Sequence, residues 1–408
     1  MMPQQNLLQD WMKTTNVSTV MKALNADGAE VRFVGGCVRD AILNRPINDI
    51  DIATEAKPEA VMDLLCRSRI KAIPTGIRHG TITALVDSQP FEITTLRRDL
   101  DTDGRHAKVI FTNDWQADAE RRDFTINALS LSPNGQIFDY VGGRQDILLG
   151  KVRFVGNAKT RIKEDVLRIL RFYRFFADYG IAPANAEARA ACCEMAPLLK
   201  QLSGDRTRHE ILKLLASRDP TPSVKIMQID GILSYCLTKS ANLDRLKRLI
   251  TIEKKISTKI GICNTDVMLR LTALVDNNTS EITRLAKRLN LPNRFRRRLE
   301  AATGPTPDEG KLEEALYKLG SRAVRDRLVL AWSLVEGVDL PFSVLSTINN
   351  WRNPTFPLTG QDGLAAGMAP GPELGHTLSI IEDWWVDNNF LPDREHCLKK
   401  LRGLISYV

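Results

Sequence analysis

The chain has 408 residues, of which 43% are hydrophobic, and a formal net charge of +8. This length exceeds a single compact core and predicts two to four domains. No apolar run of about 18 residues occurs, so we expect no transmembrane helix, and the first 20 residues lack the basic region and apolar core of a signal peptide. Excess positive charge alone is a weak indication of an anionic partner such as nucleic acid.

The seven cysteines are scattered along the chain and include no CxxC pair. This usage fits a reducing cytoplasm and argues against a disulfide framework or a thiolate zinc site. We therefore expect a cytoplasmic protein that does not associate with membranes.

The first part of the chain mixes short β-rich runs with turns. "EVRFVGG" (30–36) and "IDIAT" (50–54) predict strands, and "PEAVMDLLCRSR" (58–69) predicts a helix. "HGTITALV" (79–86) and "PFEITTL" (90–96) predict a hairpin, because turn residues separate them.

From about residue 155 the pattern changes to amphipathic helix. "KTRIKEDVLRILRFYRFFADYG" (159–180) has helical periodicity up to Gly180, and almost everything after it also reads as helix. We therefore predict an α+β fold, in which a small mixed α/β head with an antiparallel-rich sheet precedes an all-α remainder.

Two carboxylates alternate with apolar residues in "INDIDIAT" (47–54). On a strand, Asp49 and Asp51 would share one face, about 7 Å apart along the chain. They repel each other unless water screens them or a cation lies between them, and Mg²⁺ takes oxygen ligands of this kind. Glu92 would supply the third carboxylate that two-metal phosphoryl transfer needs. The alternative is an exposed acidic edge strand, with Glu92 an ordinary solvent-facing residue.

A glycine-rich turn, "VGGCVRD" (34–40), precedes the acidic pair. Gly35 and Gly36 would let the backbone approach a phosphate at a helix N-terminus, and Arg39 can donate charge-assisted hydrogen bonds. A Gly-Gly turn alone is usually only a turn. Followed by a same-face Asp pair, it favours a nucleoside triphosphate with Mg²⁺.

"RRDFTINAL" (121–129) offers further nucleotide contacts. Arg122 can bind a triphosphate, Asp123 can accept hydrogen bonds from ribose hydroxyls, and Asn127 can order the turn. Capping of a helix N-terminus by Asp123 is the structural alternative, and both roles can hold at once.

In "EDVLRILRFYRF" (164–175), one acid and three arginines are spaced by three residues, predicting one polar stripe on a helix. Its members are Asp165, Arg168, Arg171 and Arg174. A surface ion pair between Asp165 and Arg168 is the ordinary interpretation. The excess of arginine instead suits a ligand that carries negative charge and a hydrogen-bond donor.

Cytosine and adenine each present an amino donor beside a ring-nitrogen acceptor. Asp165 can accept from the amine, and Arg168 can donate to the ring nitrogen. Guanine and uracil present a carbonyl and a ring N–H there, so both contacts would be mismatched and buried polar groups left unpaired. One Asp–Arg pair can therefore admit C and A and reject G and U.

These motifs, with "DYVGGRQDI" (139–147) and "LSGDRTRHEILKLL" (202–215), resemble in order and spacing those of bacterial class II tRNA nucleotidyltransferases. That family contains the CCA-adding enzymes and belongs to the polymerase β-like nucleotidyltransferase superfamily, as bacterial poly(A) polymerases do. The resemblance implies a head (1–152), a neck (153–220), a body (221–300) and a tail (301–408). It also implies a hinge at 139–146 and a flexible loop within 97–111.

The resemblance also implies roles for the candidate residues. The metal-binding catalytic carboxylates would be Asp49, Asp51 and Glu92. The nucleotide-binding residues would be Gly35, Gly36, Arg39, Arg122, Asp123, Asn127, Asp165, Arg168, Arg171 and Arg174. The implied reaction is Mg²⁺-dependent, template-independent addition of C, C and A from CTP and ATP to the 3′ end of tRNA. The tRNA acceptor stem and elbow would be recognised by shape, with 294–298 and 322–327 as candidate contacts.

Other activities fit the same motifs. A bacterial poly(A) polymerase would keep the same Asp–Arg pair, because adenine satisfies it, and an A-adding-only enzyme would keep the loop. A CC-adding enzyme would be expected to lack "DTDGRH" (101–106), which this chain retains. A non-catalytic RNA-binding protein could have lost any of the candidate carboxylates without losing its binding.

Overall fold

The computed structural model describes residues 7–101, 108–237, 241–260, 265–275 and 278–405. The chain divides into two compact units, which are described separately. Unit 1 comprises residues 1–241 and 287–291, and unit 2 comprises 242–286 and 292–408. The finer division into head, neck, body and tail remains a prediction.

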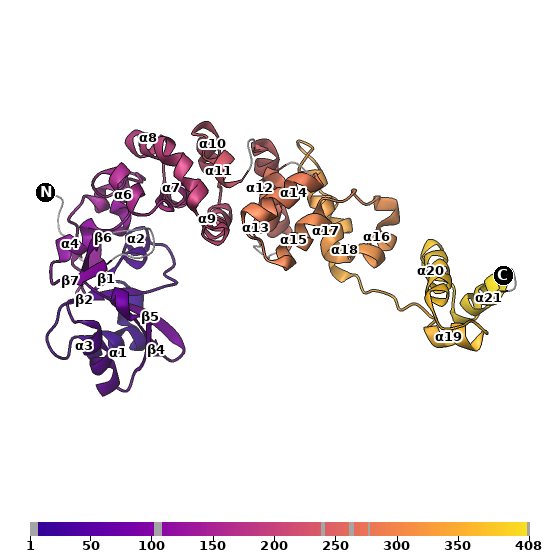
Figure 1. Ribbon diagram of the computed structural model, residues 1–408, viewed down its shortest axis with the longest axis horizontal. Helices are drawn as coiled ribbons and strands as arrows, with labels where there is room; N and C mark the ends of the chain where they lie inside the picture. Colours follow the sequence, from indigo (N-terminus) through magenta and orange to yellow (C-terminus); the bar gives the residue numbers. More distant parts are fainter. Residues whose placement is uncertain (1–6, 102–107, 238–240, 261–264, 276–277, 406–408) are drawn as a thin grey trace. The chain divides into compact units, whose positions relative to one another are not determined.

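The first half of unit 1 contains the β-sheet seen in Figure 1. This sheet has seven strands in the order β3-β4-β5-β2-β1-β8-β9. Its pairings among the described residues are antiparallel except that of β2 with β5, which is parallel. The strands are β1 (Val31–Val34), β2 (Asp51–Thr54), β3 (Lys71–Gly76), β4 (Thr81–Val86), β5 (Gln89–Thr95), β8 (Ser130–Leu131) and β9 (Ile137–Phe138). The predicted α+β class with an antiparallel-rich sheet is therefore confirmed.

Apolar side chains on alternate strand positions form the core of this sheet. Phe33, Ile52, Ile82, Phe91 and Ile93 are each at most 1% exposed. Helix α3 packs against β3 and β4, and α1 packs against α3 and β4. We call this sheet and the helices around it the head. Its helices are α1 (Thr15–Leu24), α2 (Gly36–Ile42), α3 (Pro58–Arg67), α4 (Trp115–Glu120) and α5 (Gly143–Leu148).

The predicted hairpin is present as β4 and β5, with Asp87 and Ser88 at its turn. Both turn residues have positive φ, the backbone geometry that matches the right-handed twist of two-residue hairpins. A second two-stranded sheet follows, formed by β6 (Arg97–Asp101) and β7 (Lys108–Phe111). The centre of the predicted flexible loop, 102–107, lies outside the described residues.

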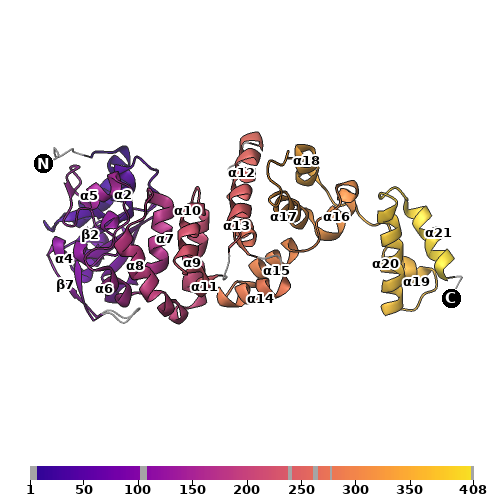
Figure 2. The same cartoon turned by 90° about the horizontal axis from the view of Figure 1, so that it is seen from above.

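Helices make up the rest of unit 1, and α7 lies beside α9 and α10 (Figures 1 and 2). Phe124, Phe154 and Phe172 form an aromatic cluster that joins α7 to the head, with ring centroids 4.8–6.5 Å apart. These helices are α6 (Ala158–Glu164), α7 (Arg168–Tyr179), α8 (Ala186–Met195), α9 (Gly204–Ala216), α10 (Thr221–Ile229) and α11 (Leu233–Cys236).

The prediction of one continuous helix over 159–180 is wrong, because the structure has two helices there, α6 and α7, with a break at Asp165. Asp165 adopts an extended conformation (φ −150°, ψ 108°), and its Oδ1 accepts a hydrogen bond from the Leu167 amide at 3.1 Å. An Asp side chain that bonds a nearby backbone amide competes with the helix in this way. Asp165 therefore precedes α7, and Arg168 is the first residue of that helix.

In the described residues of unit 2, the regular secondary structure is entirely helical. Leu249, Leu269, Leu316, Leu328 and Leu330 belong to one buried cluster, and Ile381, Trp385 and Leu401 to another. Its helices are α12 (Leu243–Ile260), α13 (Val267–Leu274), α14 (Thr279–Arg288, whose end belongs to unit 1), α15 (Asn293–Ala302), α16 (Leu312–Leu319), α17 (Ser321–Trp332), α18 (Phe342–Asn350), α19 (Gly360–Ala365), α20 (Pro372–Asp387) and α21 (Arg394–Ile405).

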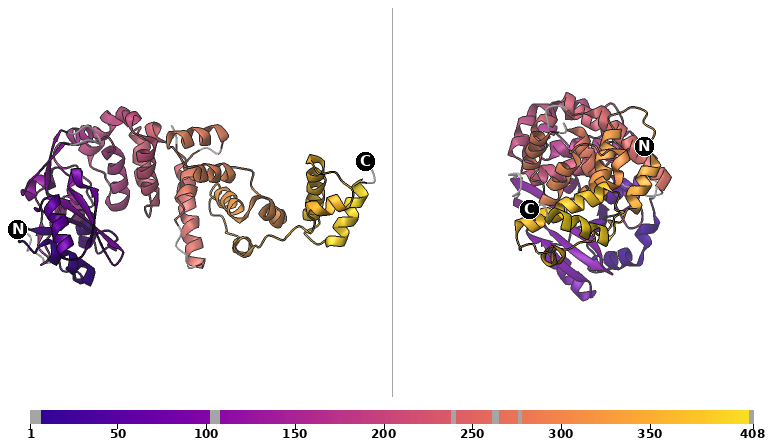
Figure 3. Two further views of the ribbon diagram at one scale, coloured as in Figure 1. Left: turned by 60° about the horizontal axis from the view of Figure 1, so that its bottom comes forward. Right: turned by 90° about the vertical axis from the view of Figure 1, so that its right-hand side faces the viewer.

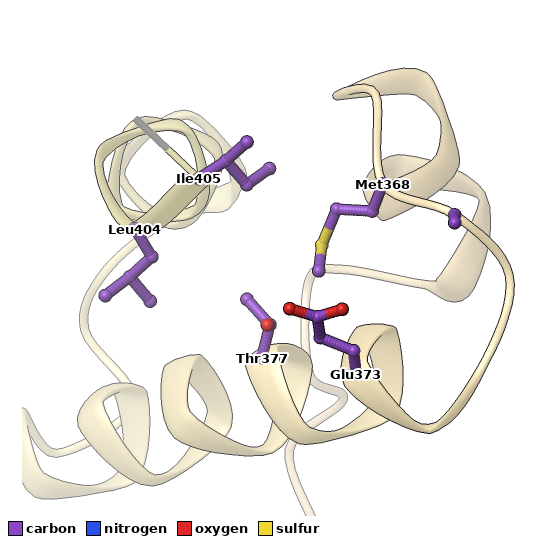
Figure 4. Close-up of a pocket in the computed structure, with 6 residues that line it drawn as sticks. Met368, Glu373, Thr377, Leu404 and Ile405 are labelled. Atoms are coloured by element: carbon purple, nitrogen blue, oxygen red, sulfur yellow. The ribbon is translucent and has the colours of Figure 1, made fainter. Parts of the chain in front are cut away.

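Near the end of unit 2, α20 and α21 lie side by side (Figures 1 and 3). A hollow of about 280 Å³ opens beside them, lined by Met368, Ala369, Glu373, Thr377, Leu404 and Ile405 (Figure 4). None of the residues predicted to bind nucleotide lines this hollow. No described helix is both long and apolar enough to cross a membrane.

Candidate nucleotide-binding site

The parallel pairing of β2 with β5 brings two predicted catalytic carboxylates together, because Asp51 lies directly opposite Glu92. Burial and the charge of Glu92 raise the pKa of Asp51 to about 6, although Arg122 and Arg39 act in the opposite direction. The two acids therefore repel each other across the strand pair, as expected of carboxylates arranged to share a cation.

Asp49 is exposed and lies two residues before β2 begins, so the strand starts later than the sequence pattern predicts. Ile50 and Ile52 are buried, so the alternation that puts Asp49 and Asp51 on the same side continues beyond the strand. Among the described residues, no three His, Cys, Asp or Glu side chains form a complete set of metal ligands. Oxygen donors on Asp51 and Glu92 nevertheless suit a hard divalent cation.

The glycine turn lies against the same carboxylate. Gly35 has φ +72°, a conformation that L side chains rarely adopt. A Cβ at Gly35 would lie 3.3 Å from Arg122 Nη1 and 3.6 Å from Asp51 Oδ2. Glycine is thus needed here both for its backbone geometry and because Arg122 and Asp51 approach the turn closely.

A buried acid, Asp118, holds Arg122. Arg122 Nη2 donates to Asp118 Oδ2 at 3.2 Å, and Arg121 Nε donates to Asp118 Oδ1 at 2.8 Å. Burial opposes ionisation of Asp118, but the two guanidinium groups outweigh it and hold its pKa below the usual range. The Arg97 amide, at the start of β6, also donates to Asp118 at 3.4 Å, so this carboxylate contacts both Arg122 and the base of the predicted loop.

Asp123 links the head to α7. Its Oδ2 accepts from Arg171 Nε at 2.7 Å, and its Oδ1 accepts from Asn127 Nδ2 at 3.1 Å. Burial opposes ionisation of Asp123, yet Arg171 and Asn127 hold its pKa below the usual range. Asp123 is therefore a carboxylate, as an acceptor for a ribose hydroxyl must be.

Arg39 is only 7% exposed and uses all three of its nitrogens within the protein. Nη1 donates to Asn127 Oδ1 at 2.6 Å, Nη2 donates to Tyr179 Oη at 2.6 Å, and both Nε and Nη2 donate to Asp40. The triphosphate role expected of Arg39 from the glycine-rich turn and from the family resemblance stays a prediction.

The predicted base-selecting residues are held at the break between α6 and α7. Asp165 accepts from Arg206 Nη2, which lies 2.9 Å from both carboxylate oxygens. Arg168 Nη1 donates to the Arg161 carbonyl and to Glu164. Within the described part of the chain, the Nε and Nη2 groups of Arg168 have no hydrogen-bond partner and can donate to a ligand.

The two remaining arginines of the motif also contact acids. Arg174 Nε donates to Glu210 Oε2 on α9 at 2.6 Å, and Arg171 lies 3.9 Å from the other oxygen of Glu210. The four residues thus do not form one stripe along a single helix, as the sequence pattern predicted. Instead, each contacts a charged group on another element. Asp165 contacts Arg206 of α9, and Arg168 contacts Glu164 of α6. Arg171 contacts Asp123 of the head, and Arg174 contacts Glu210 of α9.

The sequence comparisons agree with this arrangement. Residues 31–153 match the family described as "Poly A polymerase head domain", and 185–241 match "Probable RNA and SrmB- binding site of polymerase A". CCA tRNA nucleotidyltransferase 1, mitochondrial, from Danio rerio is 33% identical over 380 residues, which is 91% of this chain and 87% of the relative. A CCA-adding enzyme from Lactobacillus delbrueckii subsp. bulgaricus is 33% identical over 375 residues, 89% of this chain and 91% of the relative.

This chain belongs to the CCA-adding enzyme family of tRNA nucleotidyltransferases. Its fold is that of the Bacillus stearothermophilus CCA-adding enzyme solved with CTP, with a TM-score of 0.78 and 23% identity over 98% of this chain and 99% of that one. A Thermotoga maritima CCA-adding enzyme complexed with tRNA gives a TM-score of 0.65 at 19% identity, over 95% and 94% of the two chains. The predicted membership of this family is therefore confirmed.

Several residues around this family's motifs were not singled out from the sequence. Asp118 stands four residues before Arg122, a helical spacing from which the ion pair could have been predicted. Arg206 and Glu210 lie 41 and 36 residues from the groups they contact, and Tyr179 lies 140 residues from Arg39. No local pattern could have indicated these partners.

Proposed function

We propose that this protein adds C, C and A, in that order, to the 3′ end of tRNA from CTP and ATP, releasing pyrophosphate. The observation that carries this proposal is the similarity of the chain to named CCA-adding enzymes, which are 33% identical to it over about nine tenths of its length. Solved relatives hold CTP, ATP or tRNA. The six described cysteines are free thiols, which suits work in the cytoplasm.

Base choice would rest on Asp165 and Arg168. An Asp165 oxygen would accept from the amino group of cytosine or adenine, and the free nitrogens of Arg168 would donate to the adjacent ring nitrogen. Arg206, which donates to both Asp165 oxygens, would hold Asp165 oriented toward the base. Guanine or uracil would leave these groups unpaired, which costs more than losing a contact.

The sugar and phosphates would be held from the head. Asp123, ionised and fixed by Arg171, would accept from a ribose hydroxyl, with Asn127 ordering it. Arg122, held by Asp118, would bind the triphosphate beside the backbone of Gly35 and Gly36, and Arg39 would add positive charge nearby. Arg171 and Arg174 would fix α7 and contribute positive potential around the nucleotide.

We propose that Asp51, Glu92 and Asp49 hold Mg²⁺, since their donor atoms suit a hard cation. When bound, Mg²⁺ would supply electrostatic stabilisation of the attacking hydroxyl and the leaving pyrophosphate. The protein's own contribution is to keep the Asp51 and Glu92 carboxylates adjacent through the register of β2 with β5.

A bacterial poly(A) polymerase or an A-adding-only enzyme is the alternative, since one matched family is described as a poly(A) polymerase head domain. Incubation with tRNA transcripts that end before CCA, after C and after CC separates these activities. With CTP alone, we expect two additions to the first transcript and one to the second. With ATP alone, only the third should grow, by one residue. Long A tails on any transcript, or addition of A alone to the transcript that ends before CCA when both nucleotides are present, would contradict the proposal.

A further inference from the structure

Two arginines of the head hold Tyr179, the last residue of α7. Arg39 lies 3.9 Å from the centre of the Tyr179 ring and donates to its hydroxyl, and Arg45 lies 4.5 Å from the same ring. Arg45 Nη2 also donates to the carbonyl of Asp178 at 2.8 Å. Burial raises the pKa of Tyr179 to about 12, so its hydroxyl stays protonated at neutral pH.

Tyr179 ends a line of contacts along one face of α7. Arg171, Phe175 and Tyr179 are spaced by four residues and therefore lie on one side of the helix. Arg171 pairs with Asp123, the Phe175 ring meets Phe124 edge-on at 5.3 Å, and Tyr179 is held by Arg39. The face of α7 toward the head is thus fixed near its start, at its middle and at its end.

The two ends of this face are joined through the head by Asn127. The side-chain nitrogen of Asn127, Nδ2, donates to Asp123, and its side-chain oxygen, Oδ1, accepts from Arg39. The resulting chain of contacts runs from Arg171 through Asp123, Asn127 and Arg39 to Tyr179. Because Arg39 is buried and its nitrogens are engaged in this chain, its charge serves to hold α7 in place.

We propose that Tyr179 is a positioning residue that sets the placement of α7, and with it Arg168 and Asp165, relative to the nucleotide held by the head. This inference rests on the proposed function. From Tyr179 to Arg168 a helix measures roughly 16 Å, and because a helix moves as a rigid element, a shift at its end displaces its start. Hydrogen-bond recognition tolerates only about 0.5 Å of such displacement.

Two substitutions separate the hydroxyl from the ring. Tyr179→Phe keeps the ring between the two arginines but leaves an Arg39 N–H unpaired. Tyr179→Leu removes both the ring contact and the hydrogen bond. We expect the ratio of kcat/KM for CTP over UTP, on tRNA ending before CCA, to fall on the order of tenfold in Tyr179→Leu, and less in Tyr179→Phe.

Tyr235→Phe is the matched control, since Tyr235 lies on α11 with its ring facing Lys200 and should keep the wild-type ratio. The Kd of tRNA should stay at the wild-type value in all three variants. An unchanged CTP/UTP ratio in both Tyr179 variants would overturn the inference. So would a uniform loss of activity toward both nucleotides, because a purely structural role would lower both alike.

A binding measurement keeps this test separate from the proposed function. The Kd of CTP and of UTP can be measured by calorimetry with Mg²⁺ and no tRNA. If the wild-type protein binds CTP more tightly than UTP, loss of that preference in folded Tyr179→Phe or Tyr179→Leu supports the inference whatever product is made. Failure of the wild-type protein to extend tRNA would contradict the proposed function alone. Should Tyr179→Leu not fold, an unaltered preference in Tyr179→Phe overturns the inference.

Discussion

The most informative single residue is Asp51, because its ionised carboxylate lowers the stability of the metal-free fold. Its side chain is partly buried, lies opposite Glu92, and has an oxygen 3.6 Å from where a side chain on Gly35 would begin. Such a carboxylate disfavours ionisation unless a cation is present. The repulsion that destabilises the metal-free site is thus also what makes it receptive to a divalent cation.

This arrangement predicts that Asp51→Asn stabilises the metal-free protein at pH 7 and abolishes nucleotide addition. The pKa of Asp51 is about 6 in the fold, against an ordinary value of 3.8. Since the unfolded chain loses this proton first, the group lowers stability as the pH rises from about 4 to about 6. At pH 7 the variant should gain on the order of 2 kcal/mol.

Urea denaturation of both proteins in EDTA measures this gain. The difference in unfolding free energy should narrow between pH 7 and pH 5, because the wild-type carboxyl takes up its proton in that range. A variant no more stable than the wild type at pH 7 would show that the repulsion does not act on folding.

The elements of the head could be predicted largely from local sequence. The hairpin of β4 and β5 follows from alternation and turn residues, and α3 follows from its periodicity. The register that sets Asp51 against Glu92 could not be predicted, because β2 and β5 are parallel and a helix and further strands separate them in sequence. Pairing of this kind depends on the whole sheet.

The break between α6 and α7 could have been foreseen only in part. Asp is a residue that bonds neighbouring backbone amides, but the surrounding periodicity favoured a continuous helix. What fixes Asp165 outside the helix also includes Arg206 of α9, a partner distant in sequence. The candidate base-selecting residues could therefore be identified from the sequence, whereas the residues that they contact could not.

The placement of Arg168 at the start of α7 predicts a specific defect in Arg168→Ala. Without its free nitrogens, the ring nitrogen of cytosine or adenine loses its donor, so discrimination against uracil and guanine should fall by roughly 10- to 100-fold. Triphosphate affinity should change far less, because Arg122 and the glycine turn remain.

Incorporation assays with each of the four nucleotides, together with the KM for CTP, measure the two effects. Arg161→Ala is a useful comparison, since Arg161 also pairs with Glu164 but lies in α6. Undiminished preference for CTP and ATP in Arg168→Ala would show that another group selects the base.

At the scale of the whole molecule, the matches extend across both units, so relatives share the helical second unit as well as the head. That unit carries clustered arginines that the sequence analysis named as candidate tRNA contacts. In the structure, neighbouring arginines of one cluster differ in exposure and in ion pairing. Arg297 is exposed, whereas Arg298 donates to Asp326 at 2.8 Å and also pairs with Asp266.

These neighbours should therefore respond differently to substitution. Arg297→Ala should weaken tRNA binding several-fold at low salt and reduce the salt slope of binding by about 1, without changing the Tm. Arg298→Ala leaves Asp326, which is 2% exposed, as an unpaired buried charge. We expect it to lower stability by about 3–5 kcal/mol.

Filter binding over a salt series and thermal denaturation measure the two outcomes. If Arg297→Ala binds tRNA as the wild type does, this part of α15 is not a contact. If Arg298→Ala keeps the wild-type Tm, its ion pairs contribute little.

The central claim is that one site chooses C, C and then A through protein side chains and then stops. Sequencing the 3′ ends of a tRNA transcript lacking CCA, after incubation with all four nucleoside triphosphates and Mg²⁺, tests it most directly. We predict that nearly all extended ends read CCA and go no further. Ends that carry runs of A, or that incorporate U or G as readily as C, would contradict it.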